Sequence, residues 1–266
     1  MDIYGILLFI FGIFMGSFFT KVGIRLPENK SIFSKSKCTF CNHEFSFVEK
    51  IPIISYIING GKCKNCNSKI SILNPIIELV TGLLFFLTYK SFIDVSNADI
   101  AIIFGIVFIS SLIIIFVSDV KYMLIPNELL IFFASIMVCL KIFLGIKNEE
   151  LLSIMDIGYE LIFMFIDAAV MFIIMLLIKK IGKLVFKKDA LGGGDVKMMA
   201  YISMIMGYKM SIVIIFIASF IALPLSIYKA YKKDEVLLPF GPFLAISTVL
   251  LFLLKVDFNS LLELIH

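Results

Sequence analysis

Two aspartates in this 266-residue chain stand at the edges of long apolar segments. Asp119 directly follows the apolar run at 99–118, and Asp195 follows three glycines and opens another apolar run. An ionisable side chain at such a position is costly and is a functional candidate by default. If the two carboxylates approach within a few ångströms, one stays protonated while the other is charged, a pair that can activate water and polarise a carbonyl.

Each aspartate also has a simpler interpretation. Acidic residues are common at helix starts, and Lys121 or Lys197 could hold the neighbouring carboxylate. Catalysis that depends on histidine is excluded, because the chain has only two histidines, His43 and His266. A Ser-His-Asp triad or a His-Glu-x-x-His metal site cannot be assembled from them. Carboxylates must therefore carry any acid–base step.

The residues around the aspartates support the catalytic interpretation. Glycines 192–194 are expected to adopt backbone angles closed to other residues and to let a substrate backbone pass close to Asp195. A flexible link after a basic loop is the alternative. Pro126 suits the first turn of a helix and redirects the chain after Asp119. A plain helix start explains Pro126 equally well. Asp167, in the middle of a predicted span, is expected to form hydrogen bonds or pack.

Four of the five cysteines lie in one polar insertion, roughly 28–74, as two Cys-x-x-Cys pairs: Cys38, Cys41, Cys63 and Cys66. Two intervening residues let a knuckle aim both sulfurs at one point, and the 21 residues between the pairs match a small zinc-ribbon-like fold. We expect one structural zinc ion, since four sulfurs close the site. Two disulfides or four unligated thiols are the alternatives, and His43 is a competing ligand. Cys139 is expected to pack.

The composition identifies an integral membrane protein. Hydrophobic residues make up 61% of the chain, against about 45–50% in soluble domains, and the mean hydropathy is +1.05. Segments near the roughly 20 residues needed to cross hydrocarbon predict an all-α polytopic fold. About eight transmembrane helices are expected, at 3–24, 75–92, 99–118, 127–146, 158–178, 196–208, 210–229 and 240–256. The first is expected to remain in the mature protein.

Lys and Arg set the expected orientation, because they favour the cytoplasmic side. Residues 21–74 are rich in Lys and Arg, whereas the following loop carries Asp94 and Asp99. This places the N-terminus outside and both the cysteine loop and the aspartates on the cytoplasmic side. The net charge of +4 then reflects topology, with no support for a nucleic-acid partner. The expected divisions are a first transmembrane helix, a tetra-cysteine domain, a second helix with its outer loop, and a membrane catalytic domain: 1–27, 28–74, 75–98 and 99–266.

Taken together, these motifs resemble the prepilin peptidases, or type IV leader peptidases. These are polytopic aspartyl proteases that process type IV prepilins and type II secretion pseudopilins. Besides the paired cysteines, the resemblance rests on Gly16-Ser17-Phe18-Phe19, Arg25-Leu26-Pro27, Asn74-Pro75-Ile76-Ile77-Glu78-Leu79, Asp119 through Asn127, Gly192-Gly193-Gly194-Asp195-Val196-Lys197 and Pro239-Phe240-Gly241-Pro242. It covers the chain nearly end to end.

The resemblance implies that Asp119 and Asp195 are the catalytic pair, with supporting roles for Gly192, Gly194, Lys197, Pro126 and Asn127. Substrates would carry a short basic leader and then an apolar helix. They would be cut after the leader's terminal glycine, at the cytoplasmic boundary of the bacterial inner membrane and amid its lipid. Many relatives with the cysteine loop then methylate the new N-terminal amine with S-adenosylmethionine. Glu78 is a candidate for that cofactor's site, and its alternative role is a helix N-terminal charge.

Other classes of membrane protein remain to be compared. An ion-coupled transporter also carries aspartates within its spans, but it favours midplane carboxylates and an inverted repeat, which the sequence does not display. A zinc-sensing scaffold would use the cysteines and leave both aspartates unexplained. Presenilin-like proteases share Gly-x-Gly-Asp, yet the cysteine loop is not expected in them.

Overall fold

The computed structural model describes most of the chain, and its ranges are 3–38, 40–46, 49, 51–187, 191–232, 239–256 and 258, with backbone only at 186 and 230. His266 lies outside these ranges. The chain divides into two compact units, Met1–Lys90 and Ser91–His266, and each is described by itself.

The first unit contains α1 (Ile3–Arg25), the short α2 (Ile54–Ile58) and α3 (Leu73–Phe92). Small residues let α1 and α3 approach closely: a Cβ added to Gly12 would lie 2.8 Å from the Cα of Gly82. Close contact at small residues is a common way for apolar helices to pack in a membrane. The cysteine-rich loop lies between α1 and α3 in sequence.

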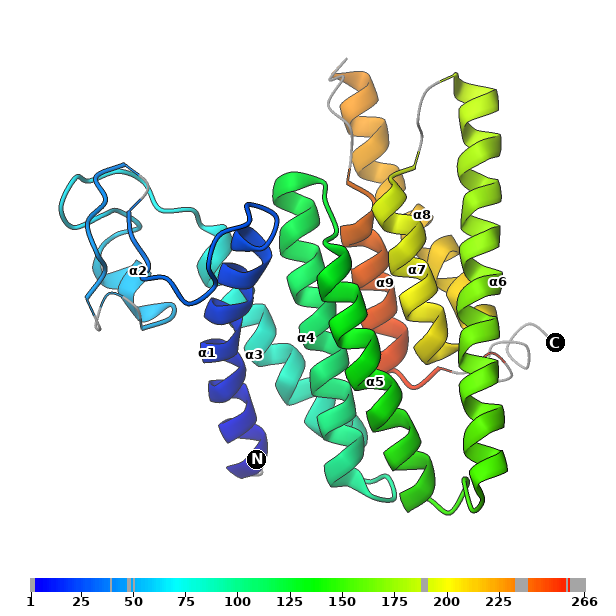
Figure 1. The fold of residues 1–266 in the computed structure, drawn as a ribbon. Helices are drawn as coiled ribbons and strands as arrows, with labels where there is room; N and C mark the ends of the chain where they lie inside the picture. The colour runs from blue at the N-terminus through cyan, green and yellow to red at the C-terminus, as the bar shows by residue number, and fades with distance from the viewer. Residues whose placement is uncertain are drawn as a thin grey trace. The chain divides into compact units, whose positions relative to one another are not determined.

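The second unit consists of six described helices (Figure 1). They are α4 (Ala98–Tyr122), α5 (Asn127–Lys147), α6 (Ile154–Phe186), α7 (Gly193–Met206), α8 (Tyr208–Tyr231) and α9 (Gly241–Leu253). Helix α4 packs against α5 and α9, while α7 packs against α5, α6, α8 and α9. Helices α4 and α7 therefore form much of the interior, and each carries one of the two aspartates.

The predicted fold class is confirmed. Six helices are long and apolar enough to cross a membrane, namely α1, α3, α4, α5, α6 and α8. The two remaining expected spans coincide with α7 and α9, which have 14 and 13 residues. At about 1.5 Å per residue these two helices are roughly 20 Å long, shorter than the ~30 Å hydrocarbon core. The described residues contain no β-strand and only two isolated bridges. The protein is a multi-pass helical membrane protein.

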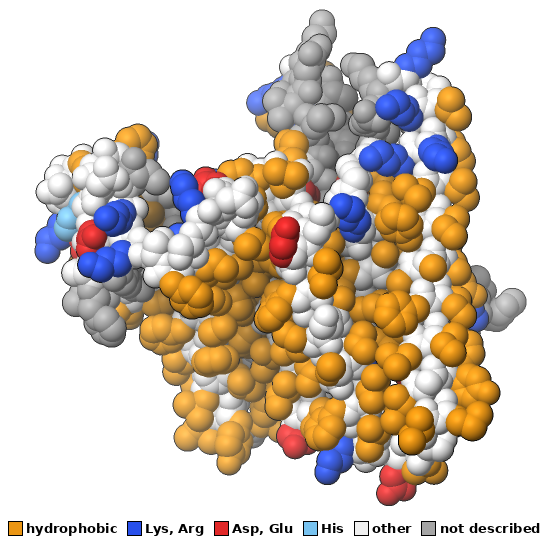
Figure 2. All heavy atoms as spheres, in the orientation of Figure 1, with side chains coloured by type: hydrophobic (Ala, Val, Ile, Leu, Met, Phe, Trp, Pro, Cys, Tyr) orange, Lys and Arg blue, Asp and Glu red, His pale blue; other side chains and the backbone are white. Residues whose placement is uncertain are grey.

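The outer surface of the second unit is apolar. Figure 2 shows hydrophobic side chains covering the lateral faces of α5 and α6, with basic side chains gathered near one end of α6. Phe163 and Phe165 of α6 are 60% and 62% exposed, as expected of side chains that contact lipid. The basic residues at the end of α6 include Lys180 and Lys183.

Hydroxyl groups connect the inner helices. Ser111 of α4 and Tyr201 of α7 share a buried hydrogen bond of 2.7 Å. Ser203 Oγ of α7 donates to the backbone oxygen of Asp167 in α6 at 2.8 Å. Asp167 is half-buried and its carboxylate lies beside Gly207, in the turn between α7 and α8. The Ser203 hydrogen bond is accepted by the Asp167 backbone, so the expected hydrogen-bonding or packing role of its side chain stays a prediction.

Candidate active site and metal centre

Asp119 lies at the C-terminal end of α4, where the chain turns sharply. Met123 adopts the left-handed conformation, with φ of 52°, and its N–H donates to the backbone oxygen of Asp119 at 2.9 Å. Ser118 Oγ donates to the backbone oxygen of Leu124 at 2.5 Å and closes the turn into α5. These contacts hold the Asp119 side chain at the end of the bundle, where it is only 5% exposed.

Asp195 lies in the first turn of α7. Its Oδ2 accepts a hydrogen bond of 3.2 Å from the N–H of Gly192, which precedes the helix. A carboxylate in this position caps a helix N-terminus and is stabilised by the helix dipole. The capping role expected as a simpler interpretation is therefore present. It orients the side chain without exposing it, since Asp195 is 6% exposed.

The two aspartates face each other beside Gly241, the first residue of α9. A Cβ built on Gly241 would lie 2.6 Å from Asp119 Oδ2 and 3.4 Å from Asp195 Oδ1. The position of this Cβ is close to both Asp119 Oδ2 and Asp195 Oδ1, so the two oxygens are close to each other as well. Three helices thus bring two buried carboxylates to one place, as the sequence predicted for Asp119 and Asp195.

One carboxylate oxygen of this pair lacks a partner. Asp119 Oδ2 is buried and accepts no hydrogen bond from the part of the chain that the structure describes. Buried polar atoms in proteins are nearly always hydrogen-bonded, and the exceptions are frequently catalytic. This oxygen can accept a proton or hold a water molecule or a substrate group.

The glycines before Asp195 act differently from the prediction. Gly192 has φ of −66°, Gly193 and Gly194 begin α7, and none of the three has a positive φ. The expectation of special backbone angles is wrong, because this turn enters the helix with ordinary geometry. Their small size matters instead: a Cβ on Gly194 would lie 3.1 Å from Ile125 Cγ1. Gly194 lets the start of α7 pack against the turn that follows Asp119.

The other residues predicted to support the aspartates lie near one another at the starts of α5 and α7. Lys197 Nζ of α7 donates to Asn127 Oδ1 of α5 at 2.8 Å. Pro126 is the N-cap of α5 and not its first helical residue, with φ of −64° and ψ of 132°. Lys179 of α6 was not singled out by sequence. Its Nζ lies near Gly193, and its charge acts on Asp195.

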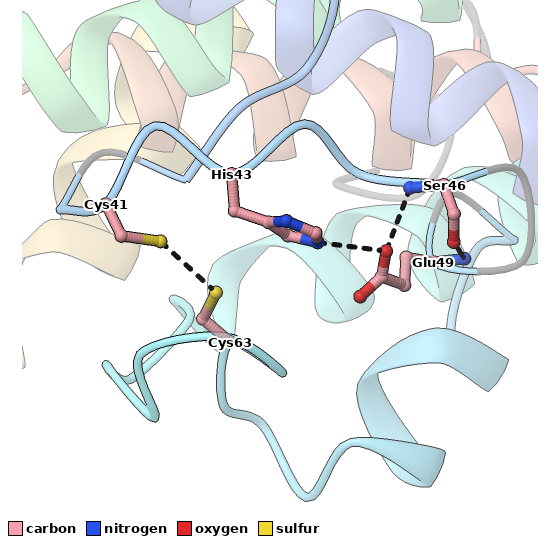
Figure 3. A network of polar contacts seen from close by, with 5 residues as sticks. All are labelled: Cys41, His43, Ser46, Glu49 and Cys63. Carbon is pink, nitrogen blue, oxygen red and sulfur yellow. Dashed lines mark hydrogen bonds and ion pairs between the residues drawn. The ribbon is translucent and has the colours of Figure 1, made fainter.

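In the first unit, the four predicted ligands converge. The Sγ atoms of Cys38, Cys41, Cys63 and Cys66 all lie within 4.8 Å of one another. The Cys38–Cys66 and Cys41–Cys63 separations are 3.7 and 3.9 Å, and Figure 3 shows the second contact. Four sulfurs at ~2.3 Å from a tetrahedral zinc ion would be about 3.8 Å apart. All four cysteines are free thiols, so the donor set fits a metal ion and not two disulfides.

The two cysteine knuckles share one backbone pattern. The N–H of the first cysteine of each pair donates to the backbone oxygen of the residue five positions later: Cys38 donates to His43 and Cys63 to Ser68, both at 2.9 Å. The residue after each second cysteine is an asparagine in the left-handed conformation, with φ of 55° at Asn42 and 54° at Asn67. Asparagine tolerates this conformation better than most residues. The repeated Cys-Asn dipeptide was a sequence signal for the knuckles that the cysteine spacing alone did not use.

His43 is not among the converging ligands. Its Nε2 lies 3.4 Å from Glu49 Oε2, which also accepts the Ser46 N–H at 2.8 Å (Figure 3). Ser68 instead contacts the sulfurs, at 3.5 Å from Cys38 and 3.0 Å from Cys66. Hydrogen bonding by its hydroxyl is the main cause that lowers the pKa of Cys38 to about 6, and it also lowers the pKa of Cys66. Ser68 therefore favours the thiolate forms that bind metal.

Glu78 has a structural partner. It is buried in α3, and its Oε2 accepts the N–H of Ile53 at 2.7 Å. Ile53 has φ of 59°, which is unusual for a β-branched residue and is maintained only by surrounding contacts. The carboxylate thus anchors the segment between the two cysteine pairs to α3.

Fold and site together define a polytopic helical membrane protein with two facing carboxylates, the layout of an aspartyl peptidase. Family comparisons agree. Residues 10–92 match the family model described as Bacterial Peptidase A24 N-terminal domain. Residues 106–227, which include both aspartates, match the model described as Type IV leader peptidase family. No solved structure matches the chain.

Relatives extend the similarity to most of the chain. A prepilin leader peptidase/N-methyltransferase of Bacillus subtilis is 34% identical over 253 residues, which cover 93% of each chain. The protein of the same name in Vibrio cholerae is 29% identical and covers 94% of this chain and 96% of its own length. One from Pseudomonas aeruginosa is 25% identical over 83% of this chain and 73% of its own. The chain belongs to the type IV leader peptidase family and is a membrane peptidase. No relative supports the transporter alternative.

Proposed function

We propose that this protein removes the leader from type IV prepilins or type II secretion pseudopilins, with Asp119 and Asp195 as its catalytic pair. The proposal rests above all on the convergence of the two buried carboxylates at Gly241. The names of the relatives supply the substrate class. The substrate is expected to carry a short basic leader, a terminal leader glycine and then an apolar helix.

The chemistry follows from two carboxyl groups that share one proton. The ionised carboxylate takes a proton from a water molecule while the water oxygen bonds to the scissile carbonyl carbon. The protonated carboxyl gives its proton to the carbonyl oxygen, which yields a neutral tetrahedral diol. As the diol collapses, the C–N bond breaks, the leaving amine takes the proton of the protonated carboxyl, and a diol hydroxyl gives its proton to the other carboxylate. One water is consumed, and the pair returns to its single shared proton.

Neighbouring residues have positioning roles in this scheme. Gly192 holds Asp195 through its N–H, and Gly194 lets α7 approach the turn after Asp119. Pro126 and Asn127 begin α5, and Lys197 bonds to Asn127 across the two helices. These contacts keep the ends of α4, α5 and α7 together, so that the carboxylates face each other before the substrate arrives.

We further propose the cytoplasmic membrane as the location, with the N-terminus outside and the cysteine loop cytoplasmic. The support is the distribution of Lys and Arg. Asp119 and Asp195 would then lie at the cytoplasmic boundary, where a basic leader joins an apolar helix within the lipid bilayer. This position matches the place at which such a substrate changes from polar to apolar.

Zinc and S-adenosylmethionine complete the proposal. The four cysteines would hold one structural zinc ion, because their sulfur separations suit tetrahedral thiolate coordination. Methylation of the new N-terminal amine is proposed from the names of the relatives. S-adenosylmethionine would supply the methyl group. Glu78 remains a candidate near that site, although its carboxylate is engaged by the Ile53 amide, and no step is assigned to it.

The test is direct. Purified protein in detergent is incubated with a prepilin and labelled S-adenosylmethionine, and the product's mass is measured. Loss of the leader's mass supports the peptidase assignment, and a further methyl group with label supports methyl transfer. An intact precursor after prolonged incubation with several prepilins and pseudopilins would contradict the proposed function.

A further inference from the structure

Gly241 occupies an unusual position between the two aspartates. It is buried at the start of α9, and the space where its side chain would be is bounded by Asp119 and Asp195. A Cβ there would lie 2.6 Å from Asp119 Oδ2 and 3.1 Å from Asp119 Cγ. Non-bonded carbon and oxygen atoms do not approach to 2.6 Å, so any side chain at 241 must displace the carboxylate. The sequence had indicated this glycine only through a motif resemblance.

The conformation of Gly241 does not itself require glycine. The φ angle of Gly241 is not positive, and Gly241 begins an ordinary helix that has Pro242 in its first turn. Proline fixes its own φ near the helical value and so favours a rigid helix start. The first turn of α9 is therefore rigid, and the Asp119 carboxylate packs against it.

Asp119 has little freedom to accommodate a larger residue. It is 5% exposed, and the turn that follows it is closed by the Met123 and Ser118 hydrogen bonds. Its short side chain could avoid a Cβ at 241 only by rotating, and that rotation would alter how its oxygens face Asp195. The unpartnered Oδ2, the atom available for chemistry, is also the atom nearest to the new Cβ.

We infer that Gly241 is a positioning residue of the peptidase: the absence of a side chain at 241 allows the Asp119 and Asp195 carboxylates to face each other at the start of α9. This inference rests on the proposed catalytic roles of the two aspartates. It assigns to α9 a part in the site beyond packing, because α9 supplies the surface that limits where Asp119 Oδ2 can lie.

The test compares two glycine-to-alanine variants in the full-length protein. Gly241→Ala adds a methyl group between the carboxylates. Gly158→Ala, in α6, is the matched control, since its Cβ would meet nothing within 4 Å. With a prepilin as substrate, Gly241→Ala is expected to lower kcat about 100-fold, the order of loss caused by an ångström-scale misplacement, and to leave KM within about threefold. Gly158→Ala is expected to match the wild type.

A thermal-unfolding comparison makes the test independent of activity. Asp119→Ala removes the carboxylate that the new methyl group would strike. We expect Gly241→Ala to lower the Tm in the wild-type background and to leave it nearly unchanged in the Asp119→Ala background, a coupling typical of residues in contact. If Gly241→Ala alone does not fold, folding of the double variant supports the inference, and failure of both contradicts it.

Each result has one meaning. A folded Gly241→Ala protein with wild-type kcat would overturn the inference and leave the proposed function intact. A fall in kcat and a rise in KM, together with equal Tm losses in both backgrounds, would also overturn it, because that pattern indicates general disruption. If the wild type cuts no prepilin, the proposed function fails, and the unfolding comparison still decides whether Gly241 limits the position of Asp119.

Discussion

Asp119 lies near the end of α4 and Asp195 near the start of α7, yet one oxygen of each carboxylate lies close to the same point beside Gly241. Both side chains are at least 94% buried, and Asp119 acts electrostatically on Asp195. Two carboxylates are rarely buried together without a function, because neighbouring like charges in a low-dielectric setting are unfavourable. Their convergence is the structural basis for assigning peptidase chemistry to this end of the second unit.

The hydrogen bond between Lys197 and Asn127 should matter more for activity than for stability. The pair is exposed, and exposed polar contacts contribute about 1 kcal/mol or less to the free energy of unfolding. Asn127→Ala is expected to lower kcat/KM about tenfold by loosening the starts of α5 and α7, with little change in Tm. Lys180→Ala, an exposed lysine of α6, is the control for loss of a surface polar group. Equal activity of the Asn127→Ala variant and the wild type would contradict the supporting role.

The buried pair of Ser111 and Tyr201 should act on stability. Tyr201→Phe removes the hydroxyl and leaves Ser111 without its buried partner on α7. The expected loss is about 1–2 kcal/mol in the free energy of unfolding, measured by denaturant titration in detergent. Tyr228→Phe is the control, because Tyr228 is 55% exposed. Equal stability of the two variants would mean that the Ser111–Tyr201 contact does not join α4 to α7 in solution.

The four-cysteine cluster should bind one zinc ion per chain. Changing Cys63 and Cys66 to Ser removes two of the four converging sulfurs, and elemental analysis of the purified protein is expected to find no zinc. Cys139→Ser is the matched control, because Cys139 is a free cysteine of α5 and is not one of the four converging cysteines. Its zinc content should equal that of the wild type. A wild-type protein without zinc, purified in the absence of chelators, would contradict the metal assignment.

Acid should release the metal from this cluster, and Ser68 should set the pH at which it does so. The pKa of Cys38 is lowered from its ordinary value near 9 to about 6. A lowered thiol pKa contributes stability that is present above pH ~9 and lost as the pH falls through ~6. Metal binding extends thiolate retention further. The pKa of Cys63 is raised in the same cluster, so the metal itself must keep that thiol deprotonated. Zinc should stay bound at pH 7 and leave as the pH falls below about 6.

Removal of the Ser68 hydroxyl tests the cause of this pH dependence. Ser68→Ala should shift zinc release to higher pH, as followed with a zinc-binding dye during acid titration. Ser46→Ala is the control, because Ser46 contacts Glu49 and not a sulfur. Superimposable release curves for Ser68→Ala and wild type would show that the hydroxyl does not stabilise the thiolates.

Local sequence patterns predicted those features that depend on neighbours in the chain. The apolar run at 127–146 became α5 at Asn127–Lys147, and the two Cys-x-x-Cys pairs closed into one cluster. The alternation of basic and acidic loops predicted that Asp119 and Asp195 lie at one depth, and their carboxylates do lie near the same point beside Gly241. These outcomes follow from the length of the apolar runs, the spacing of the cysteines and the alternation of basic and acidic loops, all of which a single sequence displays directly.

Contacts between distant helices could not be predicted in this way. The helices are apolar on all sides, so hydrophobic periodicity does not show which side of each helix faces its neighbours. It therefore could not predict that Lys179 of α6 acts on Asp195, or that Gly241 of α9 lies beside Asp119. The same limit explains the error about glycines 192–194. Their role depends on packing against Ile125, a contact made across the fold, and not on backbone angles that a local motif suggests.

The central claim is that Asp119 and Asp195 together hydrolyse the leader peptide bond, and single-turnover cleavage by Asp119→Asn and Asp195→Asn tests it most directly. Asparagine keeps the size of the side chain and removes its proton chemistry, so both variants should fold and retain zinc. We expect each variant to cleave a prepilin at least about 1,000-fold more slowly than wild type, and the double variant to be no slower than either alone, because the two groups act as a unit. Wild-type cleavage by either single variant would contradict the account.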